Sequence, residues 1–231
     1  MEMMKKIFLS GGGSSRQTEI LDKTFAEQLD KNKPLLYIPI AINTDKHPYP
    51  SCLKWLKKSF TPLGINKYIL WDEKTIYNYK KHKVSDFAGI YIGGGNTPYL
   101  LKTLKENGFW NFLKIAVNEI PIYGGSAGAI IFGKTIVTSL LEDENIVDLN
   151  DLTAMNLVNE YDISCHYIKS KEKIIKELNS SLSKVIALPE ETGLLINNSE
   201  ILVMGSKSAF LFKDGKMQEL KVGLKLHIVP Q

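Results

Sequence analysis

The sequence predicts a three-layer α/β/α fold around a mostly parallel central sheet. Two patterns carry this prediction: short, fully apolar runs recur along the chain, and longer segments between them repeat apolar residues every three or four positions. Fully apolar runs are typical of strands covered on both faces, and strands that alternate with helices usually form a parallel sheet. The predicted central strands are 6–10, 35–40, 68–71, 89–92 and 120–123.

Helices are predicted between these strands, and hairpins after them. Apolar residues recur at helical spacing in 18–29, in 52–60, and in 99–104 continuing through 109–117. The last fifty residues instead read as short strands joined by the turn residues Asn197-Asn198 and Asp214-Gly215, which predicts β-hairpins at one edge of the sheet. These predicted strands are 185–189, 193–196, 200–205 and 209–220.

Composition and charge predict one globular domain over residues 1–231. Hydrophobic residues make up 44% and charged residues 23%, which is ordinary for a folded protein that buries a core. The 29 basic and 25 acidic residues are spread along the chain, so we expect solvated helix faces and no nucleic-acid binding. No apolar run approaches the ~18 residues of a membrane span.

The two cysteines indicate the compartment and argue against a metal site. Cys52 and Cys165 form no CxxC pair and have no metal-ligand spacing. Reduced thiols fit a cytoplasmic protein, and we expect no cofactor and no metal.

The small residues around Ser126 suggest a nucleophile. Gly124-x-Ser126-x-Gly128 follows a predicted strand and fits G-x-S-x-G, the nucleophile elbow, in which a sharp turn needs neighbours almost without side chains. The next amide, of Ala127, would stand at a helix N-terminus and could donate to an oxyanion. The alternative is a plain glycine-rich turn with serine as N-cap.

A second loop could supply the other oxyanion donor. Three glycines, 93–95, end a predicted strand and precede Asn96. An oxyanion hole needs a second amide close to the elbow, glycines permit that approach, and Asn96 could fix the loop or touch substrate. The loop could equally be a phosphate-binding turn or a helix cap.

A serine nucleophile also needs a base and an orienting acid. His166 follows an apolar segment after the elbow helix, whereas His47 and His82 are expected at the surface. Glu190 stands just past an apolar strand, at the expected carboxyl end, and is the candidate acid. Asp143 and Asp162 are the other acids considered for this position.

Four motifs, taken together, resemble one family. "GGGN" at 93–96, "GGSAGA" at 124–129, a histidine followed by an aromatic residue at 166–167, and "LPE" at 188–190 occur in the order of the serine peptidases that include peptidase E and cyanophycinase. Their fold is similar to that of class I glutamine amidotransferases. The resemblance implies a cytosolic hydrolase of short peptides, with Ser126 as nucleophile, His166 as base and Glu190 as acid.

The same resemblance implies the remaining site residues. The oxyanion donors would be the backbone amides of Ala127 and of a glycine in the 93–95 loop, with Gly94 as the first candidate. Gly95 and Asn96 would lie beside Gly94. Asp143 is the fallback acid, because some accounts of the family assign that role to an aspartate after the elbow helix. A homodimer is one assembly compatible with the sequence.

One departure concerns specificity. In peptidase E, the segment after the histidine carries arginine associated with recognising an N-terminal aspartate, whereas the only arginine here is Arg16, in the first glycine-rich loop. Lys169, Lys171 and Lys173 follow His166 instead and are expected on an exposed helix face. Because lysine holds a carboxylate less specifically than arginine does, we expect at most a modest preference for aspartate.

Two other functions compete with this interpretation. An α/β-hydrolase esterase would use Ser126, Asp214 and His227, which follow the chain order of that fold, although Asp214 would stand in a tight turn and no HGGG loop precedes it. A non-catalytic binding protein of the amidotransferase-like fold should lack a nucleophile, base or oxyanion loop, and none of these is missing.

Overall fold

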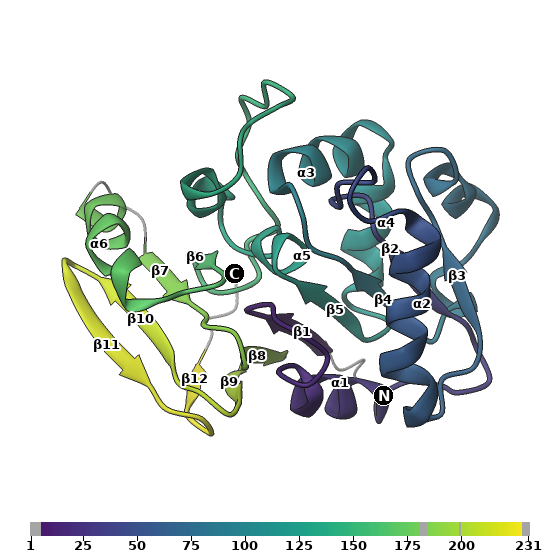
Figure 1. The fold of residues 1–231 in the computed structure, drawn as a ribbon, viewed down its shortest axis with the longest axis horizontal. Coiled ribbons are helices and arrows are strands. Elements are labelled where there is room, and N and C mark those ends of the chain that lie inside the picture. Colours follow the sequence, from purple (N-terminus) through teal and green to yellow (C-terminus); the bar gives the residue numbers. More distant parts are fainter. Residues whose placement is uncertain (1–5, 181–183, 199, 228–231) are drawn as a thin grey trace.

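Two sheets organise the residues described by the computed structural model, which are 6–180, 184–198 and 200–227 (Figure 1). The main sheet has the strand order β12-β9-β8-β1-β5-β4-β2-β3. Its parallel strands are β1 (Lys6–Ser10), β2 (Leu35–Ile38), β3 (Tyr68–Leu70), β4 (Gly89–Ile92) and β5 (Ile122–Gly125). Its antiparallel strands are β8 (Thr192–Asn197), β9 (Glu200–Gly205) and β12 (Lys225–His227).

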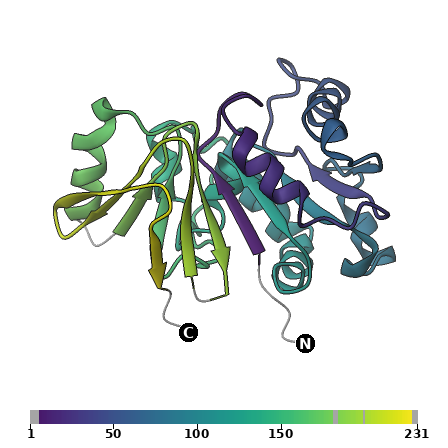
Figure 2. The ribbon, with the colours of Figure 1, turned by 90° about the horizontal axis from the view of Figure 1, so that it is seen from below.

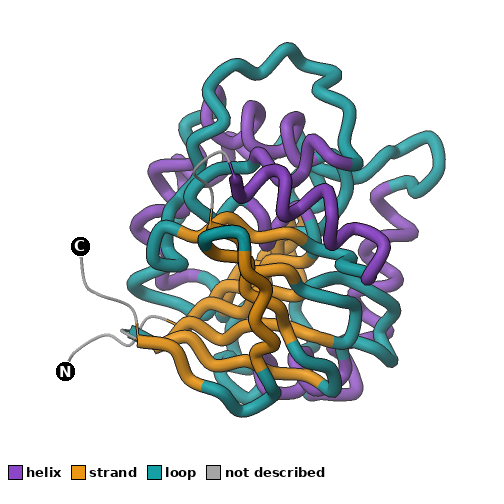
Figure 3. Tube along the Cα trace, turned by 90° about the vertical axis from the view of Figure 1, so that its left-hand side faces the viewer, coloured by secondary structure: helices purple, strands orange, loops and turns teal. Residues whose placement is uncertain are grey.

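Helices cover both faces of the main sheet because its buried strands carry apolar side chains on both sides. In β1, Phe8 packs in one core cluster, while Ile7 and Leu9 pack in the other. The Phe8 side holds α1 (Glu19–Ala26) and α2 (Tyr49–Phe60). The opposite side holds α3 (Thr97–Glu106), α4 (Phe109–Ala116) and α5 (Ala127–Ile130). Figure 3 shows helices on both sides of the strands. The predicted α/β/α layers are therefore confirmed.

A smaller second sheet lies beside the first (Figure 2). Its order is β11-β10-β7-β6, built from β6 (Tyr161–Ser164), β7 (Lys184–Ala187), β10 (Ala209–Lys213) and β11 (Lys216–Leu220). β6 and β7 run parallel, and α6 (Glu172–Ser180), which lies between them in the chain, packs against β7 and β10. Short 3₁₀ helices complete the described elements: 61–63, 76–81, 84–86, 137–141 and 169–171.

The C-terminal strands differ from the prediction of hairpins at one edge. The β8–β9 hairpin, with β12 paired to β9, extends the main sheet, whereas β7 and the β10–β11 hairpin belong to the second sheet. The physical reason is the parallel β6–α6–β7 unit, which gives β7 a partner away from the main sheet. The predicted helix running from 99 to 117 is also two helices, because Gly108 adopts φ 77° between α3 and α4.

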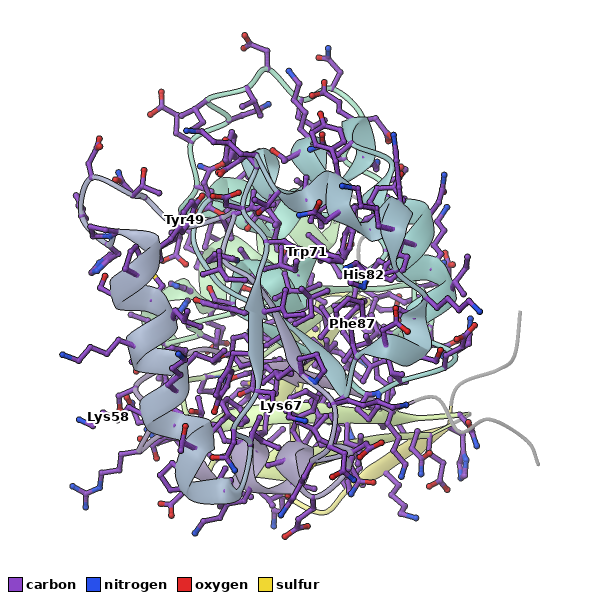
Figure 4. All side chains as sticks on the ribbon, turned by 90° about the vertical axis from the view of Figure 1, so that its right-hand side faces the viewer. Tyr49, Lys58, Lys67, Trp71, His82 and Phe87 are labelled. Atoms are coloured by element: carbon purple, nitrogen blue, oxygen red, sulfur yellow. The ribbon has the colours of Figure 1, made fainter. Side chains whose placement is uncertain are left out.

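An aromatic cluster lies near β3, an outer strand of the main sheet. Trp71 and Phe87 meet edge-to-face at 5.3 Å, and His82 packs on both rings while remaining exposed to solvent (Figure 4). The expectation that His82 is a surface residue is confirmed. Lys58 extends outward from α2, as expected of a solvated helix face.

The described residues contain neither a membrane-crossing helix nor a metal-binding cluster. None of their helices combines the length and the apolar character that a membrane crossing requires. No group of three or more His, Cys, Asp or Glu side chains in these ranges is arranged to hold a metal ion.

Candidate active site

Ser126 stands at a strained turn between β5 and α5. Its backbone adopts φ 51° and ψ −113°, a conformation that residues other than glycine rarely occupy. The glycines on either side are required by close packing: a Cβ atom at Gly124 would lie 2.2 Å from the Gly128 carbonyl oxygen, and one at Gly128 would lie 2.3 Å from that of Ile92. The chain therefore makes the elbow geometry expected of G-x-S-x-G.

The imidazole of His166 faces this serine. Its Nε2 lies 2.9 Å from Ser126 Oγ, within hydrogen-bond distance. His166 follows β6 with φ 50°, and its backbone amide donates to the Gly11 carbonyl oxygen at 3.0 Å. Gly12 packs against the ring, where a Cβ atom would lie 2.2 Å from His166 Cε1. The loop after β1 thus fixes His166 in two ways: Gly11 accepts a hydrogen bond from its backbone amide, and Gly12 packs on the face of its ring.

Glu190 lies on the other side of the same ring. Its Oε1 is 3.2 Å from His166 Nδ1, and its Oε2 accepts a hydrogen bond from Gln17 Nε2 at 2.8 Å. The Gln17 hydrogen bond, followed by the one to His166, holds the pKa of the Glu190 carboxyl below its ordinary value. Glu190 is therefore a carboxylate at neutral pH, suited to orienting the ring and stabilising its protonated form.

Parallel pairing explains why His166 and Glu190 meet. Ser164 at the end of β6 pairs with Ala187 at the end of β7, so both side chains follow the carboxyl ends of neighbouring parallel strands. The sequence had suggested such ends for both residues. The strands, however, belong to the second sheet, whereas Ser126 belongs to the main sheet.

The other two candidate acids have different partners. Asp143 Oδ2 accepts hydrogen bonds from the backbone amide and the hydroxyl of Thr97, at 2.9 and 2.6 Å, and so holds the first turn of α3. Asp162 Oδ1 accepts from the amide and hydroxyl of Thr135, at 2.7 and 2.8 Å. Of the three acids, Glu190 is therefore the one that contacts the His166 ring.

The loop after β4 lies against the elbow. A Cβ atom at Gly94 would be 3.0 Å from Ser126 Cβ and 3.5 Å from its Oγ, so the Gly94 backbone borders the hydroxyl. Ala127, whose amide follows Ser126, begins α5. Asn96 fixes the loop: its Oδ1 accepts from the Tyr99 amide at 2.9 Å and its Nδ2 donates to the Glu144 carbonyl oxygen at 2.8 Å. Gly95, the next residue, also lines the cavities beside Ser126.

Two cavities, of about 380 Å³ and about 460 Å³, both have Ser126 and His166 in their walls. The smaller one is charged, with Glu142, Asp143 and Lys171 in its wall. Lys171 corrects the expectation of an exposed lysine face. Its side chain is only 17% exposed, and its Nζ contacts Glu142 Oε1 at 2.6 Å and donates to the His166 carbonyl oxygen at 2.8 Å. Lys173, by contrast, is exposed as expected.

Residues of the competing esterase interpretation lie elsewhere. His227 in β12 is paired with Glu200 of β9, and Asp214 forms the turn between β10 and β11. Sequence reasoning missed Gln17 and Lys171. Gln17 could have been noticed as a polar residue in the loop that follows the glycine-rich end of β1, but nothing in the lysine spacing separates Lys171 from its exposed neighbours.

Comparisons with known proteins agree on one family. Residues 7–204 match the profile described as peptidase family S51. Peptidase E of Nostoc sp. is 27% identical over 94% of this chain and 93% of its own length, and peptidase E of Actinobacillus pleuropneumoniae serotype 5b is 31% identical over 93% and 95%. The crystal structure of a peptidase from an acI-B1 actinobacterium shares the fold, with a TM-score of 0.73 over 98% of both chains at 19% identity.

Proposed function

Because the chain belongs to peptidase family S51 and is therefore a serine peptidase, we propose that Ser126, His166 and Glu190 are its catalytic triad. The observation that carries the proposal is the continuous path of contacts from Ser126 Oγ through both ring nitrogens of His166 to Glu190 Oε1, at 2.9 and 3.2 Å. Nucleophile, base and orienting acid in this sequence of contacts are what acyl transfer by serine requires.

In the first half of the reaction, Ser126 Oγ attacks the peptide carbonyl carbon while His166 Nε2 accepts the hydroxyl proton. The carboxylate of Glu190 stabilises the imidazolium that forms. The carbonyl oxygen becomes an oxyanion, which accepts hydrogen bonds from the backbone amides of Gly94 and Ala127. Collapse of this intermediate transfers the proton from His166 to the leaving amine and leaves an acyl-enzyme on Ser126.

In the second half, water replaces the amine. His166 Nε2 accepts a proton from the water as its oxygen attacks the acyl carbon, and the same two amides hold the new oxyanion. Collapse breaks the bond to Ser126 Oγ, which regains its proton from His166, and the carboxylic acid product leaves. Ser126 and His166 return to their starting states, and the cycle consumes only the peptide and one water molecule.

The substrates are short peptides, with at most a modest preference for an N-terminal aspartate. Lys171 is the cation in the wall beside Ser126, but it already pairs with Glu142 and donates to the His166 carbonyl oxygen. A substrate carboxylate would have to share this ammonium with Glu142. We therefore expect kcat/KM for Asp-leading peptides to exceed that of matched Asn-leading peptides by roughly tenfold or less, far below the ~10⁴-fold of a dedicated polar site.

Labelling with a fluorophosphonate tests the nucleophile directly. The wild-type protein should form one covalent adduct, and Ser126→Ala should lose both the adduct and several orders of magnitude in kcat. Ser139→Ala is a matched control, because Ser139 lines the same cavity but bonds to the Ile136 carbonyl oxygen. Retention of more than about a tenth of wild-type turnover by Ser126→Ala would rule out the assignment.

A further inference from the structure

The larger cavity beside Ser126, of about 460 Å³, has walls of aromatic rings and is called the aromatic cavity here. Tyr37 comes from β2, Trp55 from α2 and Tyr91 from β4, so three elements of the main sheet's Phe8 side converge on it. Its other end is formed by Ser126 and His166. A group bound in the cavity would therefore lie next to the reacting carbonyl.

The rings are held rigidly. Tyr91 stacks on Tyr123 with ring centroids 4.6 Å apart, Tyr37 meets Tyr91 edge-to-face at 5.7 Å, and Trp55 meets Tyr91 at 6.2 Å. Tyr37 and Tyr91 are only 4% and 5% exposed. Packing of this kind fixes the shape of the cavity before a ligand arrives, which lowers the entropic cost of binding an apolar group.

The cavity offers no countercharge to a charged ligand. None of the described residues in its wall is Asp, Glu, Lys or Arg, although His47 stands at the exposed rim. Burial raises the pKa of Tyr37 and of Tyr91 above the ordinary range, so both phenols stay neutral. The buried carboxyl Asp22 accepts a hydrogen bond from Thr18, a wall residue, at 2.9 Å. A carboxylate at that point further disfavours an anionic ligand.

We propose that the aromatic cavity binds an uncharged apolar or aromatic side chain of the peptide, next to the scissile bond, and is the main determinant of substrate choice. This inference rests on the proposed peptidase site and names its substrate class. The charged cavity, which shares Ser126 with the aromatic cavity and holds Glu142, Asp143 and Lys171, would receive the polar part of the peptide. Burial of a leucine or phenylalanine side chain in such a cavity should raise kcat/KM by about 10- to 100-fold over glycine.

Two series of short peptides test the proposal. In one, the residue before the scissile bond is Gly, Leu, Phe, Asp or Lys; in the other, the residue after it is varied in the same way. At one of these two positions, Leu and Phe should exceed Gly, Asp and Lys by about 10- to 100-fold in kcat/KM. Equal rates across both series, or a preference for Lys or Asp at both positions, would overturn the proposal.

Variants on α2 locate the effect. Trp55→Ala should lower the Phe-to-Gly ratio of kcat/KM about tenfold by removing a wall of the cavity. Leu53→Ala, on the same helix and in the same apolar cluster but outside the cavity wall, should leave that ratio within about twofold. An equal fall in both variants would mean that a loosened helix, and not the cavity, sets the ratio, which would contradict the proposal.

Two further measurements separate this proposal from the proposed function. Fluorophosphonate labelling reports on Ser126 alone. A protein that is labelled but shows no apolar preference would support the proposed triad and contradict the proposal for the aromatic cavity. If the protein is not labelled, the triad fails, and calorimetry of Ser126→Ala still decides about the cavity. In that protein, Phe-containing peptides should bind about tenfold or more tighter than Asp-containing ones; equal affinity would overturn the proposal.

Discussion

The two sheets divide the proposed triad between them. The main sheet supplies Ser126 and the neighbouring backbones of Gly94 and Ala127 from the ends of parallel strands with helices on both faces. The second sheet supplies His166 and Glu190, which follow β6 and β7. The nucleophile is thus held by strain and close packing in a deep core, whereas the base and acid stand on a smaller sheet, with side chains 38% and 43% exposed.

The loop after β1 joins the two halves. Ser10 accepts a hydrogen bond from the Ser126 amide at 3.1 Å, Gly11 accepts one from the His166 amide at 3.0 Å, and the Gly11 amide donates to Thr192 at 2.9 Å. The Cys165 thiol fits between the carbonyl oxygens of Ser10 and Ser126, 3.6 Å from each. Alignment of the triad therefore depends on this backbone joint as much as on the three side chains.

The largest loss should follow from disabling the acid of the second sheet. Glu190→Gln keeps the shape of the side chain but removes the charge that stabilises the His166 imidazolium. We expect kcat to fall by about 10²- to 10⁴-fold with little change in the melting temperature. Steady-state kinetics at saturating peptide measures this fall.

Asp143→Asn is the matched control for that change. Because Asp143 accepts its hydrogen bonds from Thr97, its neutral isostere should cost less than about tenfold in kcat. If Asp143→Asn lost more activity than Glu190→Gln, the acid of the triad would have to be reassigned to the charged cavity.

The next change disturbs the loop after β1 without removing a member of the proposed triad. Gly12→Ala adds a Cβ atom 2.2 Å from His166 Cε1 and should push the ring out of line with Ser126. A misplacement of about 1 Å can cost about 10² in rate, so kcat/KM should fall by roughly that factor. Gly215→Ala controls for backbone strain, because Gly215 also has positive φ but no atoms near the new Cβ. Equal activity of the two variants would show that the joint tolerates displacement.

Removing Gln17 should have a smaller effect that depends on pH. Gln17 keeps the pKa of Glu190 below its ordinary value of 4.5, so in Gln17→Ala the carboxyl should take up a proton at a higher pH than in the wild type. Near pH 4.5, where a carboxyl of ordinary pKa is half protonated, activity should therefore fall by up to about twofold relative to the wild type, and by less at pH 8. Gln218→Ala, on the exposed surface of β11, is the control. A loss that does not vary with pH would leave Gln17 with a purely steric role.

The last change concerns the main sheet and stability alone. Burial raises the pKa of Asp22 from 3.8 to about 6, so between these values the folded chain holds a proton that the unfolded chain has lost, and stability falls as the pH rises. Asp22→Asn removes this charge and should raise the free energy of unfolding at pH 8 by up to about 3 kcal/mol. Urea unfolding at pH 8 and pH 5 should show the gain shrinking at the lower pH; a gain that is constant with pH would contradict the explanation.

The main sheet was more predictable from the sequence than the second one. Strands such as 35–38 and 89–92 are buried on both faces, so their apolar runs reveal them directly. In contrast, β11 has four exposed residues out of five, and β6 and β7 give no local sign of which sheet they join. Their pairing depends on long-range contacts that a local pattern does not encode.

The site shows the same contrast. The elbow was predictable because Gly124 and Gly128 are forced by packing, and a serine among such residues is conspicuous. The candidate acid could not be settled from the chain, because Glu190 follows an apolar strand while the family resemblance also allows an aspartate after the elbow helix, here Asp143. Gln17 and Lys171 were missed because their contacts join segments far apart in sequence, as the 2.8 Å Gln17–Glu190 hydrogen bond illustrates.

The buried thiol at the joint has a consequence for chemical selectivity. Burial raises the pKa of Cys165 well above the ordinary range of a thiol and raises that of Cys52 as well, so both sulfur atoms are protonated and weak nucleophiles at neutral pH. The folded protein should therefore resist soft alkylating agents such as iodoacetamide, although Cys165 directly precedes the base. Hard phosphorus electrophiles such as fluorophosphonates should react with the oxygen of Ser126 instead. Labelling with the two classes of reagent would therefore distinguish this serine peptidase from a thiol-dependent one in a mixed sample.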